Sequence, residues 1–212
     1  MPDDPARPSE LLDQARQEAR SCRACPLWEG NTQTVFGEGP VPAVAMFIGE
    51  APGAQEDAQG RPFVGPAGQL FDEALAAARI DRASVYVTNA VKHRPWTPTR
   101  NGRRNRPPRQ SEINACAMWL DRELAIVQPR VICCLGAVAA KRILGRDFKL
   151  MAQRGEWFEL PGETRVLATV HPSFVMLQRR RDDADRFAAL VGDLGKVRGA
   201  IERETDSSAE PG

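Results

Sequence analysis

The stretch that decides the fold is Val44-Ala45-Met46-Phe47-Ile48-Gly49-Glu50-Ala51-Pro52-Gly53. Its first five residues are apolar without alternation, which predicts a strand buried on both faces of a sheet. The glycines and proline that follow predict a tight turn, and they let a ligand approach the backbone closely. A turn of this composition can also be purely structural, so this stretch predicts a fold before it predicts a site.

Three more apolar runs predict strands at residues 85–88, 131–135 and 166–170. Helical periodicity separates them at residues 9–21, 66–79, 111–127, 137–144 and 182–202, with Ser111 as the N-cap of the third helix. Strands alternating with helices predict an α/β fold, a three-layer α/β/α arrangement with a central four-stranded parallel sheet. We expect a single domain over residues 9–202, a flexible N-terminus over 1–8 and a disordered tail over 203–212.

The composition is that of an ordinary globular protein, with 42% hydrophobic and 27% charged residues among 212. No apolar run approaches the length of a membrane span, and the first residues are acidic and polar rather than signal-like. We therefore expect a cytoplasmic monomer without a membrane partner. In that compartment the five cysteines are expected to be buried thiols or metal ligands rather than disulfides.

Positive charge is concentrated in two places, although the net charge is only +1. Residues 92–109 contain no acid, and their basic members are Lys92, Arg94, Arg100, Arg103, Arg104, Arg106 and Arg109. A second run is Arg179-Arg180-Arg181. One such run can be a solvated loop, but two runs that each adjoin a histidine motif favour a rim facing nucleic-acid phosphates.

The chain has only two histidines, and both follow predicted strands. His93 follows the strand that Asn89 closes, and His171 opens the motif His171-Pro172-Ser173. Gly49 and Gly136 follow the other two strands. Because the carboxyl ends of parallel strands meet at one edge of a sheet, we expect these segments to form one pocket.

Several of these residues have alternative interpretations. Phe63 is either an ordinary core residue or a stacking platform for a planar base. Asn89 is either a turn former or an amide that pairs with the edge of a pyrimidine such as uracil. Cys22-Arg23-Ala24-Cys25 is typical of half a zinc or iron–sulfur site. The other half must come from Cys116, Cys133, Cys134 or His93, although a mid-strand position makes Cys133 and Cys134 simple buried thiols.

Together these motifs resemble the uracil-DNA glycosylase superfamily, specifically the iron–sulfur family 4 enzymes and the related X-type enzymes. The resemblance extends from Cys22 to Arg180, and its specificity lies in the order of the motifs. They are Cys22-x2-Cys25-Pro-Leu, Gly49-Glu50-Ala51-Pro52-Gly53 with Glu56-Asp57, Arg61-Pro62-Phe63-Val64-Gly65, Val87-Thr88-Asn89-Ala90-Val91-Lys92, Cys116 and His171-Pro172-Ser173. The resemblance implies a DNA-repair enzyme that flips deoxyuridine out of DNA and hydrolyses its N-glycosidic bond, leaving an abasic site.

The resemblance also implies residue roles. Phe63 would stack on uracil, Asn89 would bind the edge of the base, and His171 would stabilise negative charge on uracil O2 as the bond breaks. Gly49 and Ala51 would line the uracil site.

The carboxylate of the reaction is less well defined by the resemblance. Ala51 stands where the family 1 enzymes carry their catalytic aspartate. Glu50 is the first candidate to orient water or support the developing oxocarbenium, and Asp57 is the second.

Two positions depart from family 4. His93 replaces the third cluster cysteine, as in X-type sequences, so the implied [4Fe-4S] ligands are Cys22, Cys25, His93 and Cys116. In the alternative, His93 touches phosphate, and Cys133 or an exogenous ligand completes the set.

The second departure lies in the basic loop. X-type enzymes carry a Lys-Arg-Arg-Ile-His segment whose histidine attacks the sugar and joins the protein covalently to DNA. Here the segment is Gly102-Arg103-Arg104-Asn105-Arg106, and Arg106, or Asn105, takes the place of that histidine. A guanidinium is no nucleophile, so we expect no stable adduct. Arg103, Arg104, Arg106 and Ser173 would contact single- or double-stranded DNA.

Two other functions remain open from the sequence. The chain could be a non-catalytic or weakly catalytic X-type-like binder of uracil or abasic DNA, because the altered loop or Ala51 could have disabled the chemistry. It could also be a cluster-bearing module for another nucleic-acid repair task.

Overall fold

The computed structural model describes residues 7–179 and 184–207. Its central sheet has five strands in the order β2-β1-β5-β7-β6. Four are parallel, as predicted: β1 (Ala45–Gly49), β2 (Tyr86–Asn89), β5 (Val131–Leu135) and β7 (Thr164–Thr169). The fifth strand, β6 (Trp157–Leu160), pairs antiparallel with β7 at the edge. The α/β prediction is confirmed, and β6 is an addition to the predicted four-stranded sheet.

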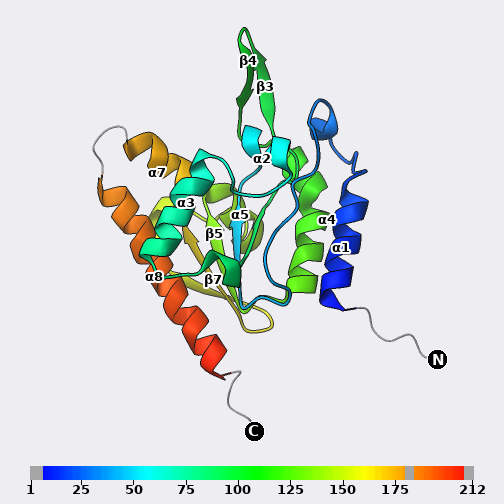
Figure 1. Ribbon diagram of the computed structural model, residues 1–212. Coiled ribbons are helices and arrows are strands. Elements are labelled where there is room, and N and C mark those ends of the chain that lie inside the picture. Colours follow the sequence, from blue (N-terminus) through cyan, green and yellow to red (C-terminus); the bar gives the residue numbers. More distant parts are fainter. Residues whose placement is uncertain (1–6, 180–183, 208–212) are drawn as a thin grey trace, which may run out of the picture.

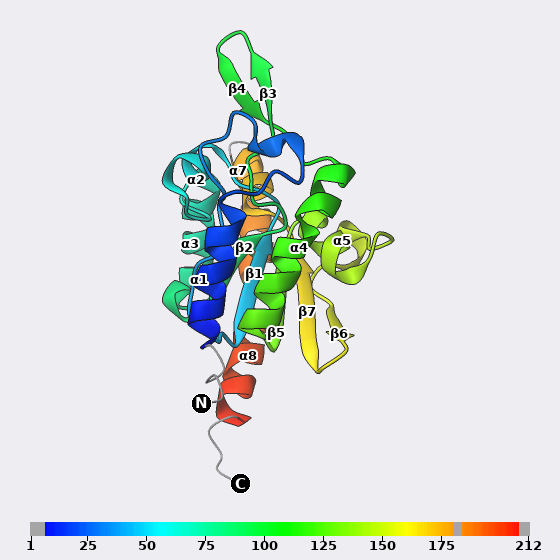
Figure 2. The same cartoon turned by 90° about the vertical axis from the view of Figure 1, so that its right-hand side faces the viewer.

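Helices cover both faces of this sheet, which gives the predicted three layers (Figure 2). Met46 and Ile48 of β1 face one core, whereas Ala45 and Phe47 face the other. The first core is covered by α1 (Pro8–Ala19), α4 (Gln110–Val127) and α5 (Ala137–Leu144). The second core is covered by α3 (Pro66–Ala77), α7 (Pro172–Arg179) and α8 (Ala184–Ser207). A strand buried on both faces is therefore the physical reason for its unbroken apolar sequence.

The ends of two helices differ from the predictions. Helix α4 begins at Gln110, so Ser111 lies inside the helix and does not cap it; the N-cap is Arg109. Helix α8 continues to Ser207, so residues 203–207 are helical and not part of a disordered tail. Residues 1–6, 180–183 and 208–212 lie outside the described part, and with them lie Arg180 and Arg181 of the second basic run. The division into one domain with flexible ends otherwise stays a prediction.

A separate two-stranded hairpin projects beyond the rest of the molecule (Figure 1). It consists of β3 (Trp96–Thr99) and β4 (Gly102–Asn105), and every residue of β4 is exposed. It contains much of the basic loop. The shorter elements are η1 (Pro26–Trp28), α2 (Ala54–Gln59), η2 (Arg82–Ser84) and α6 (Leu150–Gln153). Within the described residues, every helix is too short or too polar to span a lipid bilayer.

The order of the strands determines where a site can lie. The chain places β2 on one side of β1 and β5 on the other, so the strand order reverses at β1. Ligands of open α/β sheets bind outside the carboxyl ends of the strands, at such a reversal. Backbone hydrogen bonds tie these ends together, from Ala90 N to Gly49 O (2.9 Å) and from Gly136 N to Thr169 O (2.8 Å).

Candidate active site

Gly49 lies at the centre of the predicted uracil pocket. Gly49 is the last residue of β1 and is paired in register with Asn89, the last residue of β2. A Cβ atom on Gly49 would overlap Asn89 Oδ1 and would lie 2.5 Å from Cζ of Phe63. Only glycine therefore allows the Asn89 amide and the Phe63 ring to meet over the end of β1.

The loop that carries Phe63 is held in an unusual conformation. Phe63 has φ of 55°, a left-handed conformation that is costly for a bulky residue and that typically marks functional sites. Gly68 of α3 makes room for it, because a Cβ there would overlap the Phe63 carbonyl group. Arg82 Nη2 donates to Pro62 O (3.1 Å), which anchors the loop from its other side. The ring is buried against Phe71, with centroids 5.1 Å apart. Phe63 is thus both a core residue and a neighbour of the predicted site.

His171 follows β7, and its ring centroid lies 6.2 Å from that of Phe63. Its Nδ1 accepts the backbone N–H of Ser173 (3.1 Å) and lies 2.7 Å from Ser173 Oγ. An N–H donated to Nδ1 requires that nitrogen to be unprotonated, so the ring proton of the neutral form is on Nε2. Burial lowers the pKa of His171 to about 4, which makes it a neutral Nε2–H donor at physiological pH.

The two candidate carboxylates are held differently. Glu50 is half-buried, burial raises its pKa, and within the described residues no hydrogen-bond donor contacts its carboxylate. Asp57 is buried and accepts the backbone N–H (3.0 Å) and the hydroxyl (3.2 Å) of Thr32. Glu50 is therefore the carboxylate that remains available to a ligand, while Asp57 fastens the loop before β1.

A third carboxylate, Glu56, shapes the site, although the sequence motif that contains it assigned it no role. It is buried in α2 and accepts backbone N–H groups from Gly53 (3.0 Å), Val64 (3.0 Å) and Gly65 (2.7 Å). It thereby joins the turn after β1 to the loop that carries Phe63. The spacing from Gly53 to Glu56 is that of a helix N-terminal capping pair, which is a signal in the sequence.

A buried ion pair lies beneath Asn89 and was also missed. Lys92 and Glu123 are both fully buried and bonded to one another. Lys92 Nζ also donates to Asn89 O and Thr88 Oγ1, each at 2.7 Å. Glu123 accepts from Gly37 N (2.8 Å) and from the hydroxyl of Tyr86 (2.9 Å). The assignment of Lys92 to a phosphate-facing rim is therefore wrong, because its charge is satisfied in the core.

The remaining basic residues of the loop differ in their surroundings, and Arg100 and Arg109 are exposed. Arg94 is buried and binds the base of the hairpin through Asn105 Oδ1 (2.7 Å), so it too is structural. Arg106 donates from both terminal nitrogens to Glu112 (2.8 and 2.6 Å). Arg103 stacks on Trp96, with its guanidinium carbon 4.1 Å from the ring centroid, and bonds Gly30 O. Arg104 is exposed on β4. The exposed cations of the hairpin therefore lie on its projecting part.

Cys116 lies in α4, and Cys22 contacts the same helix through Trp119. Trp119 Nε1 donates to Cys22 Sγ (3.2 Å), and the backbone N–H of Lys92 donates to Cys116 Sγ (3.1 Å). Charge on either Cys22 or Cys25 would add to the raised pKa of Cys116, which burial lifts to about 11. Cys133 and Cys134 are fully buried in β5, as expected of small core residues.

His93, the predicted fourth ligand, is buried beside Asp57. Within the described residues, no three His, Cys, Asp or Glu side chains converge as the ligands of a single metal ion do. N–H groups aimed at cysteine sulfurs are the environment that iron–sulfur clusters use. The N–H groups directed at Cys22 and Cys116 are of this kind.

Comparison with known proteins identifies the family. A family model described as uracil DNA glycosylase superfamily matches residues 36–195. The Type-4 uracil-DNA glycosylase of Thermotoga maritima is 36% identical over 196 residues, which cover 92% of this chain and 97% of that protein. The Type-4 enzyme of Archaeoglobus fulgidus is 36% identical over 193 residues (87% and 94%), and the Type-5 enzyme of Thermus thermophilus is 28% identical over 199 residues (85% and 86%). The resemblance of the motifs is thus confirmed, and the chain belongs to the uracil-DNA glycosylase superfamily.

Proposed function

We propose that this protein is a uracil-DNA glycosylase of DNA repair, which flips deoxyuridine out and hydrolyses its N-glycosidic bond. The observation that carries the proposal is the meeting of Asn89, Phe63 and His171 around Gly49, at the carboxyl edge of the sheet. An aromatic face, an amide edge and an imidazole donor are the three groups needed to bind a planar pyrimidine and stabilise its anion.

His171 carries the main electrostatic role in this proposal. Breaking the N-glycosidic bond leaves negative charge on uracil, and a donor aimed at O2 lowers the energy of that state more than that of the substrate. The hydrogen bonds from Ser173 fix Nε2–H as the donor. A neutral imidazole suits this task because its charge need not be desolvated when the base enters.

Glu50 supplies the carboxylate, which orients the attacking water or supports the oxocarbenium. Its raised pKa, and the absence of a donor to it in the part of the chain that the structure describes, support a group held ready for a ligand. Gly49, Ala51 and Asp57 complete the substrate site, with Asp57 acting through the loop that it fastens to Thr32.

DNA contacts come from the hairpin and from the start of α7. Arg103, Arg104 and Arg106 would meet phosphates, and Ser173 would meet the backbone next to the flipped nucleotide. The pairing with Glu112 neutralises much of the charge of Arg106, which leaves Arg104 as the stronger phosphate contact. The same pair holds Arg106 as a protonated guanidinium, because Glu112 raises its pKa further. No covalent adduct can form through it, and water completes the turnover.

The cofactor in this proposal is a [4Fe-4S] cluster held by Cys22, Cys25, His93 and Cys116. The two N–H groups directed at Cys22 and Cys116 support it. The cluster would supply structural cross-linking of the N-terminal loop to α4. The expectations of a monomer and of a cytoplasmic location stay predictions.

The deciding experiment is one incubation of the purified protein with a uracil-containing oligonucleotide, analysed for free uracil and for protein–DNA adduct. We expect many equivalents of uracil per protein and no band of retarded mobility on a denaturing gel. A persistent adduct would contradict the argument from Arg106. Tight, salt-sensitive binding of the oligonucleotide without release of uracil would show that the protein is a non-catalytic binder of uracil in DNA.

A further inference from the structure

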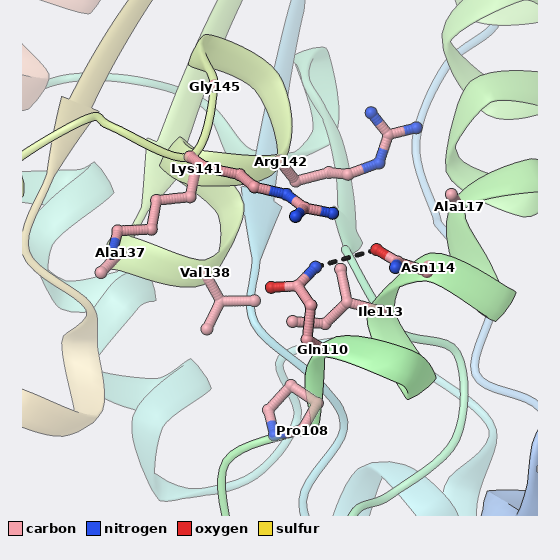
Figure 3. Close-up of a pocket in the computed structure, with 11 residues that line it drawn as sticks. Pro108, Gln110, Ile113, Asn114, Ala117, Ala137, Val138, Lys141, Arg142 and Gly145 are labelled. Atoms are coloured by element: carbon pink, nitrogen blue, oxygen red, sulfur yellow. Dashed lines mark hydrogen bonds between the residues drawn. The ribbon is translucent and has the colours of Figure 1, made fainter.

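Helices α4 and α5 enclose a cavity of about 700 Å³ that the proposed uracil site does not use (Figure 3). This volume lies within the range of small-molecule and nucleotide sites. Ile113 of α4 and Val138 of α5 form an apolar floor. The amides of Gln110 and Asn114, joined by a hydrogen bond of 2.8 Å, line the cavity from α4.

The cavity is selectively cationic. Lys141, Arg142 and Arg146 line it, and no acidic side chain does. Arg142 is paired with Asp121, outside the lining. Lys141 and Arg146 are exposed, and no carboxylate among the described residues pairs with either. Two positive charges beside an apolar floor and two amides are complementary to a ligand with phosphates and a base.

The cavity also lies next to His171, one of the residues of the proposed active site. Its wall includes Ala137, which follows Gly136 directly, and a Cβ on Gly136 would lie 3.0 Å from Cβ of His171. Lys141 lies one turn further along α5, about 6 Å at 1.5 Å per residue. A strand leaving a nucleotide bound at His171 therefore reaches the cavity within one or two nucleotides.

We propose that this α4–α5 cavity binds the DNA strand that continues from the flipped nucleotide. Two of its phosphates contact Lys141 and Arg146, and an unstacked base rests on Ile113 and Val138 with its edge at Gln110 and Asn114. This inference rests on the proposed function for the identity of the strand, but its binding is measurable without catalysis.

The test compares the variant K141Q/R146Q with the matched control R79Q/R203Q. Both residues are exposed and outside the lining of the cavity; Arg79 follows the C-terminal end of α3, and Arg203 lies near the C-terminal end of α8. Binding of a fluorescent single-stranded uracil oligonucleotide is followed by anisotropy over a range of salt concentrations. With about 0.7 counterions released per phosphate, K141Q/R146Q should reduce the slope of log K against log salt by about 1.4, and the control should leave it unchanged.

Two truncated oligonucleotides, one that begins at the uracil and one that ends at it, show which side of the strand occupies the cavity. One of the two truncations should abolish the difference between K141Q/R146Q and the wild type. An unchanged slope, or an equal reduction of the slope in the control variant, would overturn the inference. It would also be overturned if K141Q/R146Q bound a free nucleotide or an acidic peptide less tightly than the wild type but bound DNA equally well. If the wild type releases no uracil while the slope difference persists, the proposed function fails and the DNA site stands.

Discussion

Lys92 and Glu123 form an ion pair with no exposure to solvent, and the ammonium group of that pair also holds the carbonyl oxygen of Asn89. The end of β2 is therefore fixed by the ammonium group of Lys92, whose bonding partners are all buried. This makes the pair a positioning device for Asn89, whose amide meets the base in the proposed function.

Loss of either partner should be strongly destabilising. K92M or E123L leaves one buried charge without its partner, which costs about 3–5 kcal/mol in the free energy of unfolding. The double variant K92M/E123L should recover much of that loss, because no charge remains buried. Urea denaturation of the four proteins measures the coupling. Additive losses in the double variant would show that the pair is not coupled.

His171 is expected to act on the rate rather than on binding. H171A should slow uracil release in single-turnover experiments by about 10²–10³-fold, as removal of one oxyanion donor does. S173A should have a smaller effect, because the backbone N–H of Ser173 still binds Nδ1. Nitrogen chemical shifts of the imidazole ring at pH 7 should show a neutral Nε2–H tautomer. A protonated ring at that pH would contradict the argument.

The lowered pKa of His171 also predicts how stability depends on pH. Its pKa is about 4 in the folded protein and 6.5 ordinarily, so between these values the unfolded chain binds more protons. The contribution of His171 to stability is present above pH 6.5 and declines as the pH falls toward 4. The raised pKa of Glu50 acts in the opposite direction, so the difference between wild type and H171Q isolates the histidine. That difference should shrink from pH 7.5 to pH 4.5 in urea unfolding.

The proposed cluster predicts the colour and the metal content of the protein. Protein purified without oxygen should be brown and contain iron and acid-labile sulfide in equal amounts. C22S, C25S and C116S should lose both, and C134A should keep them, because Cys134 lies in the core of β5. H93C should retain the cluster with a lower reduction potential, since histidine ligation raises the potential of such centres. A colourless protein containing zinc would exclude the cluster.

Arg104 of β4 and Arg106, which follows it, should contribute differently to DNA binding. R104Q should lower the salt dependence of binding by about 0.7–0.9 per lost phosphate contact. R106Q should change it less, but should lower stability by freeing the buried carboxylate of Glu112. Equal effects on binding would show that Arg106 leaves Glu112 when DNA is bound.

The fold was predictable because unbroken apolar runs and helical periodicity each have one simple physical interpretation. Strand β6 was missed because an edge strand of four residues, Trp157–Leu160, is only partly buried and has a weak pattern. Ser111 resembled an N-cap, yet the carboxylate of Glu112 satisfies the N–H of Arg109 instead (2.6 Å).

The candidate site was predictable where motifs follow strand ends, since topology brings those ends together. Charge at Lys92 and Arg94 was misassigned for a different reason. A basic residue looks the same in a sequence whether its partner is a phosphate or a buried carboxylate 31 residues away, as Glu123 is from Lys92.

The β3–β4 hairpin is closed at its base by the bonds from Arg94 to Asn105 Oδ1 (2.7 Å) and from Arg106 N to Pro95 O (3.1 Å), and Arg103 bonds it to Gly30 O of the N-terminal loop. A two-stranded ribbon of this kind adds little to the cooperativity of unfolding. Its tip can therefore be lengthened, shortened or exchanged while the sheet beneath keeps its geometry. A graft of the corresponding loop from a relative would transfer the manner of holding DNA without transferring the chemistry, which makes the hairpin a natural unit for engineering this scaffold.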